Sequence, residues 1–373
     1  MRIGIPTETH FQEKRVGLIP SAVDILVKSG HKVFIQSGAG IESHFTDENF
    51  RDVGADIVYS AEEVYHRSEL IAKIAPLTET EADLLQEDQI LFSFLHLEIG
   101  KKKIIEKLLS KRITAIGYEL IKDEDEYPVQ QAMSEIAGQI SIQVAERFLA
   151  SDNEESRGIL LGGLTGVAPA AVVIVGAGVV GYNAARAALG RGAQVIILDT
   201  DHKKLRKVRN DFGSSCTTVM ANPYTVARGA KFADVLIGAI QVKAGKSPHV
   251  ITEEMIKSMK TGAIVLDVAI DQGGCVETSR PTSLSHPVYN EYGVLHYCVP
   301  NMPALVSRTA SYALTNAAID YITKIADQGL VKTLLGDSGL ANGVCTHNGF
   351  CSNSTIADSF NIEFRRLHLF PTN

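Results

Sequence analysis

Short apolar runs alternate with amphipathic segments along the first third of the chain. Such runs, bounded by glycine, proline or charged residues, are typical of buried strands in a parallel sheet. Residues 21–30 instead have the spacing of a helix, with Ser21 as its N-cap and Gly30 as its end. The predicted strands of this part cover residues 2–6, 32–36, 70–75, 89–95 and 112–118. This alternation predicts a parallel sheet with helices on both faces.

Two long helical patterns enclose a second run of strands. Residues 133–150 carry one apolar stripe of positions four apart, and residues 304–326 form a second helix that ends near Gly329. The strands predicted between them lie in the stretches AVVIVGAG, QVIILD, DVLIGAI, AIVLDVAI and VLHYCV. A short mixed segment follows to residue 373.

The order of these elements predicts two Rossmann-like, doubly wound α/β domains with parallel sheets, linked by the long helices and with a cleft between them. The first domain is expected to be discontinuous, formed by residues 1–130 together with 305–373. Residues 131–304 are expected to form the second domain. A chain of 373 residues is long enough to give each domain its own core.

The clearest motif of the chain lies at the start of the second domain. A predicted strand runs into Gly176-Ala177-Gly178-Val179-Val180-Gly181, and a helix and a strand ending in Asp199 follow. In this pattern the first glycine permits a tight turn, the second lets the backbone approach a pyrophosphate, and the third allows the helix to pack closely on the strand. A carboxylate about 20 residues further on accepts hydrogen bonds from ribose hydroxyls. The motif therefore predicts a dinucleotide site.

The residues around Asp199 indicate which dinucleotide binds. A carboxylate repels the 2′-phosphate of NADP, so Asp199 favours NAD. Lys203, Lys204 and Arg206 follow closely. They are either a solvated helix face, or Lys204 reaches the adenine ribose.

A second glycine pair resembles this motif only in part. In KVFIQSGAGIES, Gly38 and Gly40 follow a predicted strand, but Ser43 occupies the position of the third glycine. We therefore interpret this stretch as a plain turn.

Composition excludes several classes of function. The net charge of −7 comes without a long basic run, which argues against nucleic acids and anionic membranes as partners. No apolar stretch is long enough to span a bilayer, and the N-terminus lacks the apolar core of a signal peptide. The 5 cysteines form no CxxC pair and no zinc-ligand spacing, which favours a reducing compartment and predicts no metal site. We expect a cytoplasmic protein.

Three polar side chains follow predicted strands of the first domain. An enzyme that moves a hydride to or from a carbon bearing nitrogen or oxygen needs a proton donor and acceptor, a clamp for the substrate charge and a polarising group. His96 ends an apolar strand, Lys73 lies near the end of another, and Arg15 lies in the loop after the first strand. An arginine there could bind a carboxylate through two parallel hydrogen bonds. Each residue alone could be a satisfied core or surface group, but three groups at one sheet edge favour a substrate site.

The second domain adds candidates in VLDVAIDQGGCVETSRP and YCVPNMP. Asp271 and Arg280 follow one apolar strand, and Asn301 follows another. We interpret the acidic stretch before Gly273-Gly274 as a cofactor-facing loop, with a turn stabilised by an aspartate side chain as the alternative. Asn301 could hydrogen-bond a carboxamide or the substrate.

Taken together, these stretches resemble the alanine dehydrogenase family, whose relatives include the NAD-binding subunit of proton-translocating transhydrogenase. The resemblance rests on RIGIPTE, RVGLIP, FLHL, MSEIAG, GAGVVGYNAA, DVAIDQGGC, VPNMP and TASYALTNA, and it covers nearly the whole chain. It implies NAD-dependent, reversible oxidative deamination of L-alanine to pyruvate and ammonium. It also implies a homohexamer of two-domain subunits, in which C-terminal helices complete the first domain.

The resemblance also implies roles for individual residues. Arg15 would bind the substrate carboxylate, His96 would be the acid/base on the carbinolamine and iminium path, and Asp271 would help to activate water or ammonia. Lys73 and Asn301 are further candidates for substrate binding. The implied NAD site comprises Ser134, Gly176, Gly178, Val179, Val180, Gly181, Asp199, Lys204, Ile240, Gln241, Val268, Ala269, Ile270, Arg280, Val299 and Met302.

The chain departs from the family at one position that matters for substrate binding. The family usually has Lys-Val-Lys-Glu-Pro, and its second lysine contacts substrate, whereas this chain has Lys73-Ile74-Ala75-Pro76. Alternation in a strand would place Lys73 and Ala75 on one face. Lys73 could then reach the substrate from one pleat back, or it could be only a structural lysine in an altered pocket. Gln139 and Ala221 are lesser departures.

Three functions therefore remain open from the sequence. The first is an NAD-dependent alanine dehydrogenase. The second is a related dehydrogenase with another small amino or 2-oxo acid as substrate. The third is a transhydrogenase-like NAD-binding protein with little turnover. The retention of Arg15, His96 and Asp271 favours an enzyme, whereas the loss of the second lysine keeps the third alternative open.

Overall fold

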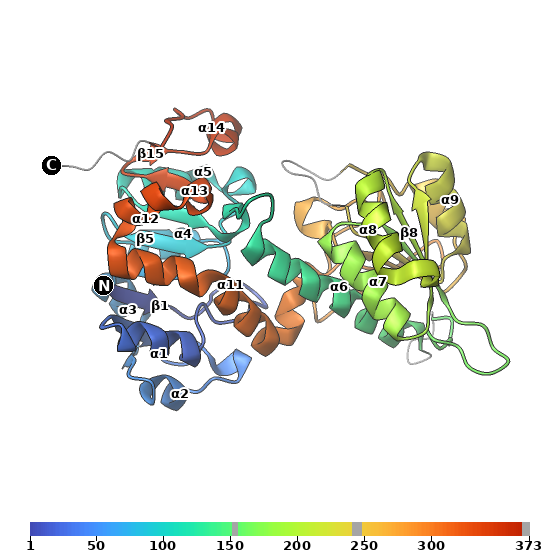
Figure 1. Ribbon diagram of the computed structural model, residues 1–373, viewed down its shortest axis with the longest axis horizontal. Coiled ribbons are helices and arrows are strands. Elements are labelled where there is room, and N and C mark those ends of the chain that lie inside the picture. The colour runs from blue at the N-terminus through green and yellow to red at the C-terminus, as the bar shows by residue number, and fades with distance from the viewer. Residues whose placement is uncertain (151–155, 241–247, 368–373) are drawn as a thin grey trace. The chain divides into compact units, whose positions relative to one another are not determined.

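The computed structural model describes residues 1–150, 156–240 and 248–367 (Figure 1). The chain forms two compact units. Unit 1 comprises Met1–Met133 and Ala304–Asn373, and unit 2 comprises Ser134–Pro303. Each unit is an α/β fold built on a mostly parallel sheet, so the predicted fold class is confirmed.

Unit 1 is built on a sheet with the strand order β15-β14-β6-β5-β4-β1-β2-β3. β1 to β6 are parallel, whereas β14 and β15 add to the β6 edge in antiparallel pairings. The strands are β1 (Arg2–Ile5), β2 (Lys32–Gln36), β3 (Asp56–Val58), β4 (Leu70–Ala72), β5 (Ile90–Ser93), β6 (Thr114–Gly117), β14 (Val344–His347) and β15 (Phe350–Cys351). The C-terminal segment, expected to be short and mixed, therefore contributes two strands to the first sheet.

Helices cover both faces of this sheet, as the alternating pattern predicts. One face packs against α3, α4, α5 and α14 through a continuous apolar cluster, and α1 and α11 pack against each other (Figure 1). The helices of unit 1 are α1 (Pro20–Lys28), α2 (Asp47–Arg51), α3 (Ala61–Arg67), α4 (Glu79–Leu84), α5 (Lys102–Ser110), α11 (Ser307–Gln328), α12 (Leu330–Gly336), α13 (Ser338–Asn342) and α14 (Ser354–Phe360). Short 3₁₀ turns are η1 (Ile41–Ser43), η2 (Leu97–Ile99), η3 (Tyr118–Leu120) and η6 (Met302–Val306).

Unit 2 contains a sheet with the strand order β12-β13-β11-β10-β7-β8-β9, in which only the β12–β13 pair is antiparallel. The strands are β7 (Ala171–Val175), β8 (Gln194–Asp199), β9 (Cys216–Met220), β10 (Val235–Gly238), β11 (Ile264–Asp267), β12 (Val288–Glu291) and β13 (Val294–Tyr297). Its helices are α7 (Val179–Gly190), α8 (His202–Phe212), α9 (Pro223–Phe232) and α10 (Glu253–Lys257), with 3₁₀ turns η4 (Gly213–Ser215) and η5 (Ile270–Gln272). The long helix α6 (Pro128–Leu149) contains the end of the first part of unit 1 and the start of unit 2.

Several predicted boundaries were wrong for identifiable physical reasons. The helix predicted from residue 21 begins at Pro20, where a missing N–H costs nothing, and Ser21 is not its cap. The strand predicted to reach residue 75 ends at Ala72, because the backbone N–H groups of Ile74 and Ala75 donate to the Glu8 carboxylate. Lys73 and Ala75 therefore lie beyond the strand, and the strand alternation that would place them on one face does not apply.

Both sheets have a point where the chain order reverses. In unit 1 it lies between β4 and β1, and in unit 2 between β10 and β7. Loops that leave neighbouring strands in opposite directions at such a point open a crevice at the carboxyl edge, which is where α/β folds bind ligands.

Candidate functional site

The three candidates of unit 1 follow three neighbouring strands of its sheet. Arg15 lies in the loop after β1, Lys73 directly follows β4, and His96 lies after β5. Because β5, β4 and β1 are adjacent and parallel, their carboxyl ends lie at the same edge. The Arg15 and Lys73 loops thus flank the reversal point of the sheet, and the His96 loop lies one strand further along the same edge.

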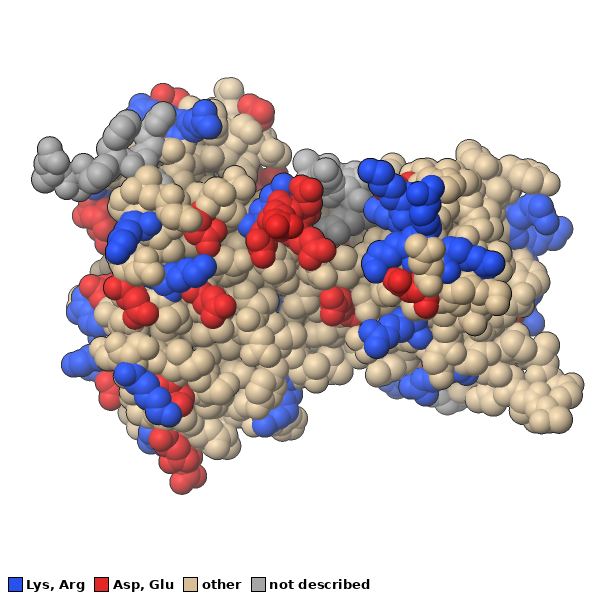
Figure 2. All heavy atoms as spheres, viewed as in Figure 1, with Lys and Arg blue, Asp and Glu red and all other residues tan. Residues whose placement is uncertain are grey.

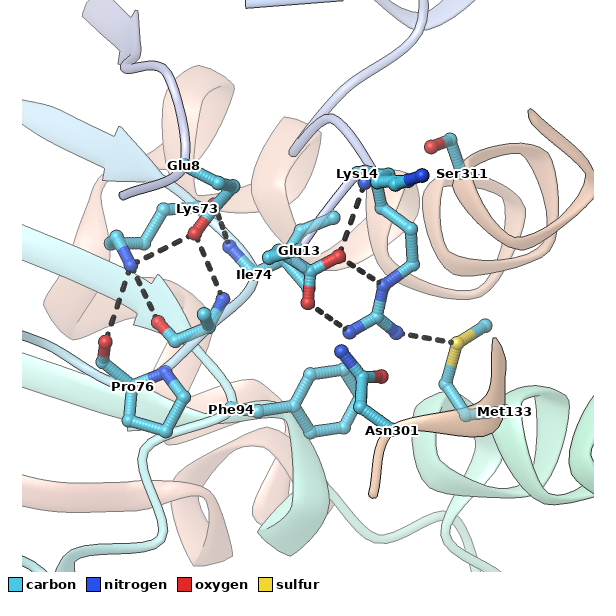
Figure 3. Close-up of polar contacts among 12 residues, drawn as sticks. Glu8, Glu13, Lys14, Lys73, Ile74, Pro76, Phe94, Met133, Asn301 and Ser311 are labelled. Atoms are coloured by element: carbon cyan, nitrogen blue, oxygen red, sulfur yellow. Dashed lines mark hydrogen bonds and ion pairs between the residues drawn. The ribbon is translucent and has the colours of Figure 1, made fainter. Parts of the chain in front are cut away.

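Arg15 is buried and fixed by a neighbouring carboxylate. Its Nε lies 2.7 Å from Glu13 Oε1 and its Nη2 lies 2.5 Å from Glu13 Oε2, so the two groups form a bidentate pair. The Glu13 carboxylate also accepts a hydrogen bond from the Arg15 backbone N–H. Nη1 donates to the thioether of Met133 at 3.2 Å (Figure 3). The plane of the guanidinium group is therefore set before any ligand binds.

Lys73 is completely buried and contacts two carboxylates. Its Nζ lies 3.1 Å from Glu8 Oε2 and donates to the carbonyl of Ala75 at 2.6 Å (Figure 3). Glu81 Oε1 lies 3.5 Å from the same Nζ. Glu8 in turn accepts from the backbone N–H groups that follow Lys73. This network ties the loop after β1 to the end of β4. Of the two alternatives for Lys73, these contacts favour the structural one.

His96 lies in a tight turn that a second buried carboxylate stabilises. Its backbone has φ of 41°, in the left-handed region that non-glycine residues seldom adopt. The Glu119 carboxylate accepts hydrogen bonds from the N–H groups of Leu95 and His96 at 3.2 and 2.8 Å. Burial raises the pKa of Glu119, while nearby His96 and the backbone N–H groups oppose that rise. The strained turn is thus held by a side chain from another loop.

The imidazole of His96 is accessible and oriented by its neighbours. Its side chain is 37% exposed, its Nδ1 lies 4.0 Å from Glu98 Oε1, and its ring stacks on Phe94 with the planes 15° apart. An imidazole that is both accessible and oriented can donate and accept a proton.

The glycine motif of unit 2 has the geometry that the sequence predicts. Gly176 has φ of 112°, and a Cβ there would lie 2.3 Å from the Ala239 carbonyl, across the reversal point between β7 and β10. A Cβ on Gly181 would lie 1.8 Å from the Gly176 carbonyl, so α7 can approach the turn only with glycine at this position. A Cβ on Gly178 would meet open space. This space, at the N-terminus of a helix of 12 residues, fits a phosphate group.

Asp199 closes the motif at the end of β8. Its carboxylate accepts from the N–H groups of Ala177 at 2.6 Å and Asp201 at 2.7 Å, and Lys204 Nζ lies 3.8 Å away. Asp199 therefore fixes the glycine turn in addition to any contact with a ribose. Lys204 shares α8 with Lys203, Arg206, Lys207 and Arg209, and Lys and Arg side chains gather over the part of unit 2 where α8 lies (Figure 2).

The other candidates of unit 2 lie in loops after neighbouring strands. Asp271 lies on the 3₁₀ turn after β11, and its carboxylate accepts from the Asn301 N–H at 3.3 Å. Arg280 lies over the ring of Tyr289, 4.3 Å from its centroid. Asp267, by contrast, is buried and accepts from the N–H groups of Cys275 and Val276, which fits the turn-stabilising alternative.

The implied cofactor residues share one edge of the unit 2 sheet. They follow the carboxyl ends of β13, β11, β10, β7 and β8, which are consecutive in the sheet. Ser134 is the exception, because it lies on α6. Gln241 lies outside the described residues. In the order of the strands, these residues are Val299 and Met302; Val268, Ala269, Ile270 and Arg280; Ile240; Gly176, Gly178, Val179, Val180 and Gly181; and Asp199 with Lys204.

The described residues contain neither a cluster of metal-ligating side chains nor a helix that could span a membrane. In the ranges 1–150, 156–240 and 248–367, no group of three or more His, Cys, Asp or Glu side chains could hold a metal ion. Within the same ranges, no helix combines the length and the apolar character needed to cross a membrane.

Sequence comparison identifies the family. Residues 4–137 match the profile described as "Alanine dehydrogenase/PNT, N-terminal domain", and residues 141–354 match "Alanine dehydrogenase/PNT, C-terminal domain". The chain belongs to the alanine dehydrogenase/PNT family. The predicted family is thereby confirmed, and family membership together with the Rossmann-like unit 2 implies a nicotinamide cofactor.

Individual members of the alanine dehydrogenase/PNT family resemble the chain over nearly its whole length. An alanine dehydrogenase of Methanococcus maripaludis is 42% identical over 98% of both chains, and one of Mycobacterium tuberculosis H37Rv is 40% identical over 98% of both. A solved L-alanine dehydrogenase has a TM-score of 0.92 at 41% identity, covering 97% of this chain and 99% of that one. A transhydrogenase of Sinorhizobium meliloti shares the fold, with a TM-score of 0.80 at 20% identity over 94% and 98% of the two chains.

Sequence reasoning missed three carboxylates of unit 1 that hold Lys73, Arg15 and the turn at His96. Glu8 and Glu13 lie on the loop after β1 and Glu119 lies on η3, and none of the three belongs to a periodic pattern. Of the three, Glu13 could have been found from the sequence, because an acidic residue two positions before an arginine in a short loop can form an ion pair with that arginine. Glu8 contacts a lysine 65 residues away, so only the folded chain reveals that pair.

Proposed function

We propose that the protein catalyses NAD-dependent, reversible oxidative deamination of L-alanine to pyruvate and ammonium. The observation that carries this proposal is that the Arg15 and His96 loops lie at the same carboxyl edge of the unit 1 sheet, in a chain about 40% identical to alanine dehydrogenases. In this proposal unit 1 supplies Arg15 and His96, and unit 2 binds the dinucleotide and supplies Asp271.

Each group has a defined part in the balanced reaction, in which L-alanine, NAD⁺ and water give pyruvate, ammonium, NADH and a proton. Arg15 would bind the substrate carboxylate, for which it would exchange a weak thioether acceptor, Met133, for a charged one. His96 would accept a proton as the amine is oxidised and return one as water adds and ammonia leaves. Asp271, with Asn301 beside it, would orient the water or ammonia. The bound cofactor would accept the hydride from the α-carbon.

NAD is the proposed cofactor, with Asp199 as the discriminating residue. Its carboxylate lies at the end of β8, where it would accept hydrogen bonds from the ribose and repel a 2′-phosphate. Because Asp199 also accepts from the Ala177 N–H, its substitution would loosen the glycine turn as well. We therefore expect Asp199→Asn to raise the KM for NAD about tenfold or more without creating efficient use of NADP.

The contacts of Lys73 favour a second candidate function within the same chemistry. The lysine is bound by Glu8, Glu81 and the Ala75 carbonyl, which leaves the position of the family's second lysine to an uncharged Ala75. A site changed in this way could prefer another small amino or 2-oxo acid. A transhydrogenase-like protein with little turnover is the remaining alternative.

We further propose that the enzyme is a cytoplasmic homo-oligomer, by resemblance to its family a homohexamer. The 5 cysteines are free and buried thiols, which suits a reducing compartment. Leu160, Leu164 and Val167 are each more than half exposed on one turn of unit 2, as expected of an apolar surface that another subunit covers.

The test is NADH formation by the purified protein with NAD and L-alanine, beside a panel of other small L-amino acids. We expect turnover with L-alanine. Activity only with another member of the panel would support the second candidate function. Absence of turnover with the whole panel, while NAD still binds, would contradict the enzymatic proposal and favour a binding role.

A further inference from the structure

The segment that carries Arg15 is held on both sides by two serine hydroxyls. Ser43 Oγ donates to the Lys14 carbonyl at 2.7 Å, and Ser311 Oγ accepts from the Val16 N–H at 3.0 Å. The two hydroxyls lie 3.0 Å apart and both serines are completely buried. Lys14 and Ser311 are visible in Figure 3. The backbone groups immediately before and after Arg15 are thus satisfied by a single connected network.

The direction of the hydrogen bonds in this network follows from the number of protons available. A serine hydroxyl has one hydrogen to donate, and that of Ser43 is used for the Lys14 carbonyl. The hydrogen between the two serines must therefore come from Ser311. The chain runs from the Val16 N–H to Ser311, from Ser311 to Ser43, and from Ser43 to the Lys14 carbonyl. In such a chain each bond polarises the next, and the loss of one hydroxyl affects both ends.

The two serines are themselves anchored to elements of the fold. Ser311 lies on α11 between Ser307, which donates to the Glu42 carbonyl, and Thr315, which accepts from the Ile19 N–H. These three hydroxyls are four residues apart and so lie on one face of the helix. Arg308, also on α11, donates to the carbonyls of Ser43 and His44. The turn with Gly38, Gly40 and Ser43 therefore connects α11 to the loop that carries Arg15.

We infer that Ser43 and Ser311 are positioning residues that set the affinity for the substrate carboxylate by fixing the backbone on both sides of Arg15. This inference rests on the proposed function, in which Arg15 binds that carboxylate. Glu13 fixes the plane of the guanidinium group, but it cannot fix where the Arg15 Cα lies, because it belongs to the same loop. The serine pair connects that loop to α11, almost 300 residues further along the chain.

The experiment compares Ser43→Ala and Ser311→Ala with the matched control Thr315→Val. The control removes a buried hydroxyl of the same helix that also accepts from a backbone N–H, but at Ile19, four residues beyond Arg15. For each serine variant we expect the KM for L-alanine and for pyruvate to rise about 3- to 10-fold, which is the effect expected from the loss of one hydrogen bond. Arg15 would bind the carboxylate equally before and during the reaction, so kcat and the KM for NAD should stay within about twofold.

Thr315→Val is expected to lower the melting temperature without changing either substrate KM. Because the serines act in series, the double variant Ser43→Ala/Ser311→Ala should raise the KM by less than the product of the single effects. Unchanged substrate KM values in both serine variants, or an equal rise in Thr315→Val, would overturn the inference. If Ser311→Ala does not fold, Ser43→Ala decides the question by itself.

An Arg15→Lys variant separates the inference from the proposed function. If the KM for L-alanine and pyruvate rises in Arg15→Lys but not in the serine variants, the positioning role fails while the role of Arg15 stands. If Arg15→Lys leaves both KM values unchanged, the proposed role of Arg15 fails, and the positioning role fails with it.

Discussion

The ammonium group of Lys73 lies 3.1 Å from the carboxylate of Glu8, and both side chains are buried. The buried ammonium and carboxylate groups stabilise the fold as a pair. If one were removed, the other would remain in the interior as an uncompensated charge, which destabilises the folded state. Glu8 also caps the end of β4 by accepting from the Ile74 N–H. Lys73 therefore contributes to the architecture of the site, whatever it does for the substrate.

Replacement of Lys73 should lower the stability of the protein. We expect Lys73→Met to lower the free energy of unfolding by about 3–5 kcal/mol, since Glu8 and Glu81 would remain buried without their cation. The double variant Glu8→Gln/Lys73→Met should recover much of this loss. Lys101→Met serves as the control, because its pair with Glu79 is exposed and contributes little. Chemical denaturation of the four proteins provides the measurement.

The same variants distinguish the two roles of Lys73. If it contacts the substrate instead, Lys73→Met should remain as stable as the wild type while kcat/KM falls by orders of magnitude, which corresponds to roughly 3 kcal/mol or more of transition-state binding. That combination would contradict the structural interpretation.

Substitution of His96 should stop the chemistry without affecting the cofactor. We expect His96→Ala to reduce kcat about 10²–10⁴-fold, the usual contribution of a general acid/base. The affinity for NAD should be unchanged, because His96 belongs to unit 1 and the glycine motif to unit 2. Fluorescence titration with NADH measures binding and steady-state kinetics measures turnover. Loss of NADH binding in this variant would count against the proposed division of roles.

Three glycines of one loop and helix form a matched set for the dinucleotide site. Gly181→Ala should destabilise the protein, since its Cβ would lie 1.8 Å from the Gly176 carbonyl. Gly178→Ala should fold normally, because its Cβ meets open space, yet it should weaken NAD binding about tenfold or more by occupying the space for the phosphates. Gly190→Ala, at the far end of the same helix and equally unobstructed, should change neither property. Normal NAD binding by Gly178→Ala would place the pyrophosphate elsewhere.

His296 should make the stability of the protein depend on pH. Burial lowers the pKa of this imidazole below 6.5. Its Nδ1 must donate to the Val294 carbonyl, so Nε2 accepts from Thr278 in the neutral form. A lowered pKa in the folded state means that this stabilisation is complete above about pH 6.5 and is lost as the pH falls, because the unfolded chain binds the proton first.

We therefore expect the melting temperature of the wild type to fall more between about pH 7.5 and pH 5.5 than that of His296→Asn. Part of the dependence should remain in the variant, because burial also lowers the pKa of His347. His249→Asn, at an exposed position, is the control and should behave as the wild type does. An equal fall in melting temperature over this pH range in His296→Asn and the wild type would show that His296 does not cause the pH dependence.

The features that could be predicted from the sequence are those that a short stretch determines by itself. The buried strands are apolar runs, and the glycine turn at Gly176 requires a backbone conformation that few other residues adopt. The order of strands and helices then predicts the fold class, which the structure confirms, and it also places Arg15 and His96 after strands of the same parallel sheet, β1 and β5, between which β4 lies.

The features that were missed depend on partners far away in the sequence. β4 ends at Ala72 because the Glu8 carboxylate accepts from the N–H groups of Ile74 and Ala75, just beyond the strand. The turn at Ser43 connects α11 to the loop that carries Arg15, because Ser43 contacts both Ser311 and the Lys14 carbonyl. Likewise, the residues of β14 pair with β6, more than 200 positions earlier. Hydrophobic periodicity carries no information about such partners, since it indicates only which residues of a segment lie on its apolar face and which lie on its polar face.

The discontinuity of unit 1 has a consequence for biosynthesis. Unit 2 is one continuous stretch of chain, so it can complete its sheet as soon as it leaves the ribosome. The sheet of unit 1 must wait for β14 to cover the β6 edge and for α11 to reach the loop around Val16. Until then the nascent chain carries an unpaired strand edge, the kind of surface that invites aggregation and binds chaperones. Unit 2 can therefore complete its fold before unit 1, although the first part of unit 1 is synthesised earlier.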